Sequence, residues 1–477
     1  MRRMDSQPAR EPHAATDHFD VIVIGAGSTG TNVAGYARDN GLSVAIVEQE
    51  LVGGECSYWA CMPSKALLGP PNAVAAARRL PGAAAAVSGS IDVAAVLDRR
   101  DDFISHLDDA SQIDWVESIG AELIKGRGRI VGVLAVEVTD EAGSVRRLSA
   151  ERGVVVATGS SPAFPPIEGL ADVGAWDNRD VTTADEVPAR LAVLGGGVVG
   201  CEMAQAYSRL GADVTIIERG DRILSTFDPW VSDLLSEAFD DDGIHLRISA
   251  EATKVHRRAS GDVVIALDDG TDIVADELLV ATGRTANTAG LGLESVGIEP
   301  DGSLDVDDEL KVTAIAEGWL YAAGDVNGRA LLTHQGKYQA RCIGDTLAGR
   351  GTRAIADHGA VPQVVFTDPE IASVGTSGLD AAGDDGLRTV SVDMSSVAGA
   401  SLTGDSGGRA ALVIDDARDL VVGAHFVGPN VGELLHSATV AIVGAVPLAT
   451  LWHAVPAYPT VSEVWLRLLE ADRGVNE

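Results

Sequence analysis

Cys56 and Cys61 are the residues of this chain whose type and spacing most directly suggest chemistry. They lie five positions apart in the stretch GGECSYWACMPSK, residues 53–65. Two cysteines at the start of a helix can form a disulfide. A helix N-terminus also favours the thiolate, which is the form that attacks a disulfide. The stretch therefore predicts a redox-active cysteine pair. The alternative is a pair of inert buried cysteines.

A glycine-rich turn near the start of the chain predicts a dinucleotide site. An apolar, β-branched run at 19–24 leads into Gly25, Gly27 and Gly30, a helical pattern follows to residue 40, and a second apolar run ends at Glu48. This is a strand–helix–strand unit. Its glycines permit a tight turn, close approach of a pyrophosphate and close helix–strand packing, and Glu48 can accept a hydrogen bond from an adenosine ribose. An ordinary glycine-rich turn is the alternative.

The same pattern recurs about 170 residues later. The run at 191–194 leads into Gly195, Gly197 and Gly200, and the following strand ends at Glu218. Two such units predict two nucleotide-binding domains.

Charge near the second turn bears on the choice of nicotinamide cofactor. A carboxylate at Glu218 accepts from a ribose 2′-hydroxyl and repels a 2′-phosphate, which favours NADH. Arg219 and Arg222 lie nearby and can receive a phosphate, so NADPH stays an alternative.

Composition excludes two classes of partner. The 477 residues carry a net charge of −34, and such a surface repels nucleic-acid phosphates. No apolar run approaches the roughly 18 residues that a membrane-spanning helix needs. The polar residues 1–18 do not resemble a secretory signal and predict a flexible tail. We expect a cytoplasmic protein that binds neither nucleic acid nor membrane.

The order of these motifs resembles that of the pyridine nucleotide-disulfide oxidoreductases, the family of dihydrolipoamide dehydrogenase, glutathione reductase and mercuric reductase. The resemblance rests on the cysteine stretch, both glycine turns, the Ala-Thr-Gly turns at 157–159 and 281–283, and the segment YAAGD at 321–325. It extends from residue 19 to about residue 469.

The resemblance implies an α/β fold with two Rossmann-like nucleotide-binding domains and a C-terminal α+β dimerisation domain. The FAD domain is interrupted by the NAD(P) domain. The expected boundaries are 19–161 and 284–355 for FAD, 162–283 for NAD(P) and 356–477 for dimerisation.

The resemblance also implies roles for individual residues. Cys61 lies against the flavin, and Cys56 is the interchange thiol. Lys65 lies near the flavin and pairs with Glu202. FAD is the implied prosthetic group, with NAD(H) as the second cofactor and NADP(H) possible. The cofactor-binding set comprises Gly25, Gly27, Gly30, Glu48, Gly54, Thr158, Gly159, Gly195, Gly197, Gly200, Glu218, Gly283, Arg284, Gly324, Asp325 and His334. No metal ligand is implied.

One departure from the family pattern affects the expected acceptor. Disulfide reductases of the family end in His-Pro-Thr-x-x-Glu, in which the His is the acid/base for thiol exchange. Here Tyr458 replaces that His, while Glu463 is present. A phenol with a pKa near 10 is a weak base at neutral pH. His453 can act as the acid/base only if the fold brings it near the cysteine pair. Because no cysteine follows Cys342, the C-terminal pair of mercuric reductases is also missing.

These observations predict a homodimeric FAD-dependent oxidoreductase. Electrons would pass from NAD(P)H through FAD to the Cys56–Cys61 disulfide and on to a small acceptor. One alternative is a flavin-centred reductase of quinones or metal ions in which the cysteine pair is modulatory. Another is a non-enzymatic, redox-sensing flavoprotein.

Overall fold

The computed structural model describes residues 17–299, 302–384, 386–404 and 407–475. The chain forms two compact units, each assembled from three separate stretches. Unit 1 comprises Met1–Gly54, Asp109–Gly159 and Ala286–Ala354, within the described residues. Unit 2 comprises Glu55–Asp108, Ser160–Thr285 and Ile355–Glu477, with the same restriction. The predicted tail falls on residues 1–16, outside the described part, and on the first two residues of a strand.

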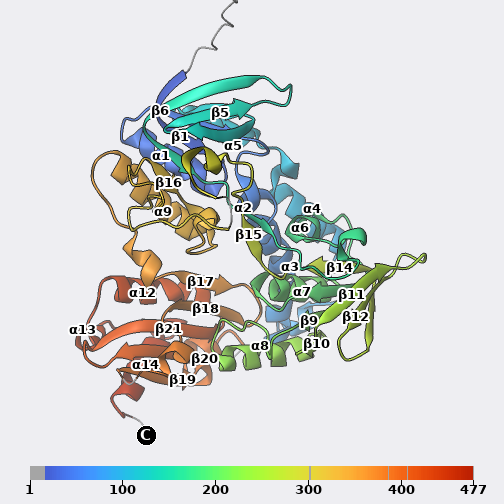
Figure 1. Ribbon diagram of the computed structural model, residues 1–477. Helices are drawn as coiled ribbons and strands as arrows, with labels where there is room; N and C mark the ends of the chain where they lie inside the picture. The colour runs from blue at the N-terminus through green and yellow to red at the C-terminus, as the bar shows by residue number, and fades with distance from the viewer. Residues whose placement is uncertain (1–16, 300–301, 385, 405–406, 476–477) are drawn as a thin grey trace, which may run out of the picture. The chain divides into compact units, whose positions relative to one another are not determined.

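A seven-stranded sheet forms the centre of unit 1 (Figure 1). Its strand order is β3-β2-β1-β6-β5-β4, and β16 pairs with the end of β6. The strands β3, β2, β1, β6 and β16 are parallel, whereas β6, β5 and β4 form an antiparallel meander. Their bounds are β1 Asp17–Ile24, β2 Val44–Glu48, β3 Glu122–Lys125, β4 Arg127–Gly132, β5 Ala135–Thr139, β6 Val145–Val156 and β16 Leu320–Ala322.

Strand β1 is buried on both of its faces, as a central parallel strand should be. Val21 and Val23 belong to one apolar cluster, while Ile22 and Ile24 belong to another. The first cluster includes side chains of α1 and α9, two helices that pack against each other. The helices of unit 1 are α1 Ser28–Asp39, α5 Ala110–Ser118 and α9 Thr333–Leu347.

The turn between β1 and α1 depends on glycine at two positions. Gly25 has a φ of +101°, a backbone conformation that residues with a Cβ rarely adopt. At Gly30, a Cβ would lie 1.9 Å from the carbonyl oxygen of Gly25. The close contact between the first turn of α1 and the end of β1 therefore requires both glycines.

The part of unit 2 that contains the second glycine turn repeats this arrangement. Its parallel sheet has the order β10-β9-β8-β14, and a three-stranded antiparallel sheet, β11-β12-β13, follows. Helix α7 comes directly after β8. The bounds are β8 Arg190–Leu194, α7 Val198–Arg209, β9 Asp213–Glu218, α8 Pro229–Asp241, β10 His245–Ile248, β11 Ala252–Arg257, β12 Val263–Leu267, β13 Asp272–Ala275 and β14 Glu277–Val280.

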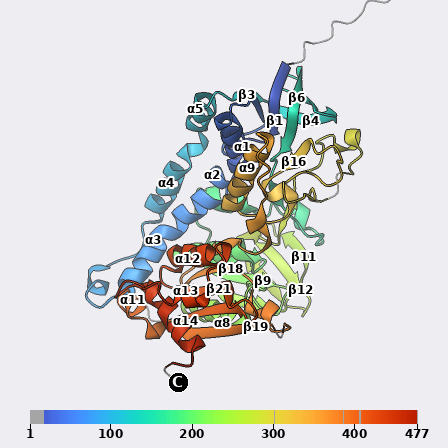
Figure 2. The ribbon, with the colours of Figure 1, turned by 90° about the vertical axis from the view of Figure 1, so that its left-hand side faces the viewer.

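The cysteine stretch of unit 2 is helical. The short helix α2, Gly54–Tyr58, begins where the chain leaves unit 1, and the long helix α3, Cys61–Arg79, follows it. Figure 2 shows α3 with α4, Val93–Phe103, which packs against it. Helix α6, Asn178–Thr183, also contacts α3 and starts with a capping box from Asp177 and Asp180. Strands β7, Ser160–Pro162, and β15, Arg284–Ala286, lie where the chain passes between the units.

A five-stranded antiparallel sheet, β17-β18-β21-β20-β19, forms the C-terminal part of unit 2. Helix α12 packs on β18 and β21, and α14 contacts β19 and β20 (Figure 1). The bounds are β17 Pro362–Val365, β18 Glu370–Gly375, α10 Gly378–Ala381, β19 Leu387–Asp393, α11 Ala398–Ser401, β20 Arg409–Asp415, β21 Leu420–Gly428, α12 Val431–Val443, α13 Leu448–Leu451 and α14 Val464–Asp472.

The predicted fold class is confirmed: both glycine turns connect a parallel strand to a helix, and an α+β part follows. Across the described residues, no helix is long and apolar enough to cross a bilayer. The described part also contains no cluster of three or more His, Cys, Asp or Glu side chains suited to a metal ion.

The packing of Gly30 generates a stability prediction. Gly30→Ala should lower the Tm of the ligand-free protein by at least about 2 °C, because overpacking against rigid backbone costs ~1–3 kcal/mol and each kcal/mol lowers the Tm of a unit of this size by about 2–4 °C. Gly27→Ala is the matched control, since the nearest atom to a Cβ there is Gly54 Cα at 3.9 Å. Scanning calorimetry of both variants measures the effect. Equal Tm values for wild type and Gly30→Ala would contradict the packing argument.

Candidate functional site

The two cysteines lie on consecutive helices of unit 2. Cys56 lies within α2, and Cys61 is the first residue of α3. Both are partly exposed. The N-terminus of a helix carries partial positive charge, which favours a thiolate at Cys61. The location of this pair is thus suited to thiol chemistry with a small molecule.

An ion pair lies one helical turn beyond Cys61. Lys65 Nζ donates to Glu202 Oε2 at 2.7 Å, and this joins α3 to α7. The Glu202 side chain is 4% exposed, and its other oxygen accepts from the backbone N–H of Phe366 at 3.0 Å. Lys65 Nζ also lies 4.8 Å from the centre of the Phe366 ring. The structure thus brings Lys65 and Glu202 together, and their catalytic roles stay predictions.

The first glycine turn can accommodate a dinucleotide. A Cβ at Gly27 would meet no atom closer than 3.9 Å, so the backbone there is open to approach. Gly25 packs against the Ala157–Thr158 peptide, and Gly27 forms a parallel bridge with Gly53. Helix α1 starts beside this opening, and its N-terminal N–H groups suit a pyrophosphate.

Glu48 stabilises that turn through both of its carboxylate oxygens. Oε2 accepts from Ala26 N at 2.7 Å, and Oε1 accepts from Glu50 N at 2.7 Å. Burial raises the pKa of Glu48, while these backbone hydrogen bonds act in the opposite direction. A carboxylate oxygen has two lone pairs, so each oxygen can still accept from a ribose hydroxyl.

The other residues of unit 1 in the predicted cofactor-binding set lie in four places. Gly54 has a φ of +60°, and a Cβ there would lie 2.8 Å from Gly27 Cα. Thr158 Oγ1 donates to Asn287 O at 2.7 Å, and Gly159 O accepts from Asn287 N at 3.0 Å. Gly324 packs closely against the side chain of Thr29, in the first turn of α1, and Asp325 follows it. His334 is the exposed second residue of α9.

The second glycine turn has the same construction as the first. Gly195 has a φ of +110°, and no atom lies within 4 Å of a Cβ at Gly197. Glu218 accepts from Gly196 N at 2.7 Å and from Gly220 N at 2.5 Å. A Cβ at Gly200 would lie 2.0 Å from the oxygen of Gly195. This turn can therefore accommodate a second nucleotide.

The cations near Glu218 differ in their surroundings. Arg222 pairs with Asp221 at 3.1 Å and donates to the backbone oxygen of Ser225. Arg219 is exposed. A carboxylate therefore lies at the turn itself, and one of the two nearby arginines already has an anionic partner.

Arg284 lies beside the cysteine stretch. Its guanidinium donates to Ser160 Oγ at 2.6 Å, to Ser160 O at 2.7 Å and to Asn178 Oδ1 at 3.1 Å. Glu55, which precedes Cys56, lies 3.6 Å from the same guanidinium. Gly283, just before it, has a φ of +145°. The cofactor-binding role of both residues stays a prediction.

The C-terminal segment holds Glu463 in an ion pair. Glu463 Oε1 accepts from Arg467 at 2.5 Å, while its Oε2 is buried with no hydrogen-bond partner in the described part of the chain. Tyr458 is 75% exposed, and His453 is also exposed. Arg467 thus holds Glu463, the glutamate of the C-terminal motif in which Tyr458 replaces the His.

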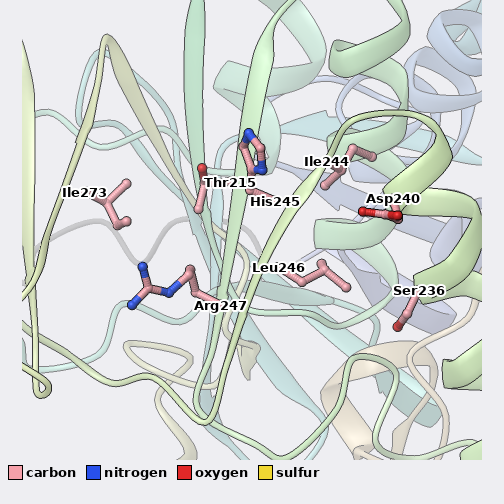
Figure 3. Close-up of a pocket in the computed structure, with 8 residues that line it drawn as sticks. All are labelled: Thr215, Ser236, Asp240, Ile244, His245, Leu246, Arg247 and Ile273. Carbon is pink, nitrogen blue, oxygen red and sulfur yellow. The ribbon is translucent and has the colours of Figure 1, made fainter.

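Figure 3 shows a cavity of about 610 Å³ in the part of unit 2 that contains β9 and β10. None of the predicted site residues lines it. Its lining consists of Thr215, Ser236, Asp240, Ile244, His245, Leu246, Arg247 and Ile273.

Sequence reasoning missed Asn178, Arg179 and Arg467. Asn178 and Arg179 contact Glu55 from α6, more than a hundred residues away in the chain. The capping box of α6 is visible in the sequence, but nothing local identifies the distant partner. Arg467 lies four residues after Glu463, a spacing at which helical side chains meet. That spacing is the signal that could have found it.

Comparison with known proteins places these features in a family. A family model described as "Pyridine nucleotide-disulphide oxidoreductase" matches residues 19–340, and the model of that family's dimerisation domain matches residues 361–468. A mercuric reductase of Staphylococcus aureus is 30% identical over 96% of this chain and 83% of its own length. A dihydrolipoyl dehydrogenase of Chlamydia muridarum is 31% identical over 94% of this chain and 95% of its own length.

A solved structure agrees with these matches. LpdA of Mycobacterium tuberculosis superposes with a TM-score of 0.85 and 27% identity, over 95% of this chain and 99% of its own. The chain therefore belongs to the pyridine nucleotide-disulphide oxidoreductase family, whose members are enzymes that use FAD and NAD(P)H.

Proposed function

We propose that this enzyme passes electrons from NAD(P)H through FAD to a disulfide between Cys56 and Cys61, and then to a small acceptor. The observation that carries the proposal is the arrangement of the cysteine stretch. Cys61 begins α3, and the Lys65–Glu202 ion pair lies one turn further along the same helix.

Two glycine turns would hold the two nucleotides. Gly25, Gly27 and Gly30 of unit 1 suit the pyrophosphate of FAD, and Gly195, Gly197 and Gly200 of unit 2 suit that of the nicotinamide cofactor. When bound, FAD supplies the two-electron step between NAD(P)H and the disulfide.

The cysteines provide the chain's own redox chemistry. The Cys56–Cys61 disulfide takes up two electrons and two protons, the S–S bond breaks, and two thiols form. Transfer of two electrons and two protons from the thiols to an acceptor re-forms the bond. The partial positive charge at the start of α3 stabilises the Cys61 thiolate.

The Lys65 ammonium would stabilise negative charge that develops near the start of α3. Its ammonium is held by Glu202, and the backbone N–H of Phe366 fixes that carboxylate in turn. A positioned cation of this kind stabilises charge that develops during electron transfer, without reorganisation at that moment.

NADH is the nicotinamide cofactor that the second turn favours. The Glu218 carboxylate is held at this turn by two backbone N–H groups, and it would repel a 2′-phosphate. The Asp221 partner of Arg222 weakens the case for a phosphate site.

A second candidate is a flavin-centred reductase of quinones or metal ions. Tyr458 is a weak base, and Glu463 pairs with Arg467, so neither matches the acid/base pair of the family's disulfide reductases. The third alternative, a non-enzymatic redox sensor, is not retained, because the family's members are enzymes.

Assembly and location complete the proposal. The match to the dimerisation-domain model supports a homodimer. A cytoplasmic location stays a prediction.

Anaerobic reduction tests the role of the cysteine pair. Adding NADH to the wild type should produce a long-wavelength band from a Cys61 thiolate beside oxidised flavin. Cys61→Ser should lack the band, whereas Cys56→Ser should show it before NADH is added, because Cys61 then has no disulfide partner. Cys342→Ala, a change at a buried cysteine of unit 1, is the control. If reduced Cys61→Ser showed the same long-wavelength band as the wild type, the proposal would be contradicted.

An acceptor screen separates the two candidate functions. Disulfides, quinones and metal ions are tested at saturating NADH on wild type, Tyr458→His, Tyr458→Phe and Cys56→Ser. If the cysteine pair is the electron outlet, Cys56→Ser loses turnover, and Tyr458→His raises disulfide reduction at least ~10-fold, since a positioned acid/base contributes about 10²–10⁴-fold. Tyr458→Phe should show no such gain. Full turnover by Cys56→Ser would favour the flavin-centred reductase.

A further inference from the structure

We call residues 55–61 the redox loop; they comprise most of α2, the turn that follows it and the first residue of α3. This segment is attached to helix α6 near both of its ends. Glu55, at its start, binds two consecutive side chains of α6, Asn178 and Arg179. Trp59, near its end, accepts hydrogen bonds through its backbone oxygen from Asn178 Nδ2 at 2.9 Å and Thr182 Oγ1 at 3.2 Å. All of these residues belong to unit 2.

Arg179 contacts the loop at two residues, Glu55 and Trp59. Its Nε lies 2.7 Å and its terminal nitrogen 2.6 Å from Glu55 Oε1. Its guanidinium also lies over the Trp59 ring, 4.0 Å from the centre. A single side chain therefore holds the residues on both sides of Cys56. Only arginine combines a planar fork for a carboxylate with stacking on an aromatic ring.

Asn178 completes the attachment and is itself held. Its amide nitrogen donates to Glu55 Oε2 at 2.8 Å, and its oxygen accepts from Arg284 at 3.1 Å. Arg284 is fixed in turn by Ser160. Asn178 is buried, so its contacts are protected from water. The backbone adds a further restraint, because Trp59 N donates to Glu55 O at 2.8 Å.

This attachment has a consequence for the cysteine pair. A disulfide forms only when the two Cα atoms lie within about 4.4–6.8 Å and the Cβ atoms face each other. Once the bond is reduced, only the rest of the structure keeps Cys56 near Cys61. A loop that is held in place maintains a high effective concentration of one thiol at the other, and this favours the disulfide at equilibrium.

We propose that Arg179 is a positioning residue for the redox pair, which acts through Glu55 and Trp59 to hold Cys56 close to Cys61 in the dithiol state. This inference rests on the proposed function, because it requires the two cysteines to form a disulfide. It adds that the disulfide–dithiol equilibrium depends on a side chain from α6, a helix outside the cysteine stretch.

Redox equilibration with glutathione tests the proposal. The holoenzyme is equilibrated with reduced and oxidised glutathione, the thiols are alkylated, and the Cys56/Cys61 dithiol fraction is measured by mass spectrometry. Two glutathione thiols give up two electrons and two protons to the Cys56–Cys61 disulfide and form glutathione disulfide. In Arg179→Ala the equilibrium should shift about tenfold toward the dithiol, which corresponds to a potential about 30 mV more positive.

Two further variants keep the test specific. Arg179→Lys retains the charge but not the fork or the stacking, so it should shift the equilibrium in the same direction by a smaller factor. It also serves if Arg179→Ala fails to fold. Arg190→Ala is the matched control, because Arg190 pairs with Asp262 and Asp276 and its side chain, like that of Arg179, is 38% exposed. It should leave the equilibrium at the wild-type value.

The outcomes distinguish this inference from the proposed function. If the wild type forms no reversible Cys56–Cys61 disulfide, the proposed function fails and this inference fails with it. If the wild type forms the disulfide while Arg179→Ala and Arg179→Lys both show the wild-type disulfide–dithiol potential, only the inference is overturned. An equal shift in Arg190→Ala would overturn it as well, because the effect would then reflect general loosening.

Discussion

The ion pair between Lys65 and Glu202 is the interaction on which the organisation of unit 2 depends. Through it, the helix that begins at Cys61 is tied to the helix that begins at the second glycine turn. The same carboxylate accepts from the backbone of Phe366, just before the C-terminal sheet continues into β18. Three segments that are distant in the sequence thus meet at one buried side chain. Removing one partner of such a pair leaves polar groups unsatisfied, which is costly in a buried environment.

The turns built by local sequence were the most predictable features. Gly25 and Gly195 are required by their positive φ angles, and Gly30 by its contact with the carbonyl oxygen of Gly25, so a glycine pattern identifies them. The strands flanking these turns also alternate between two apolar clusters, as β1 does. The strand β18 was not predicted, since its short sequence EIASVG carries no clear alternation. Family resemblance supplied the expectation that the C-terminal domain is a dimerisation domain, and the family's dimerisation-domain model matches residues 361–468.

Contacts between distant residues were beyond the reach of sequence reasoning. Arg179 and Glu55 are 124 positions apart, and neither the charge nor the spacing of Arg179 points to its partner. Arg284 was assigned to cofactor binding by resemblance, and its guanidinium contacts Ser160 and Asn178. Glu463 was identified from the C-terminal motif, and the structure pairs it with Arg467. In each case the residue can be read from the sequence, but the residue that it contacts is set by the tertiary structure.

The combination of an intact cysteine stretch and an altered C-terminal segment suggests how the enzyme differs from the family's disulfide reductases. The cysteine stretch contains both cysteines and the Lys65–Glu202 ion pair, while Tyr458 stands where those reductases have the acid/base His. The most direct test is to count the electrons that the anaerobic holoenzyme accepts from dithionite. The account predicts about four electrons per bound FAD, two for the flavin and two for the disulfide, and about two in Cys56→Ser. A wild-type count of about two would contradict it.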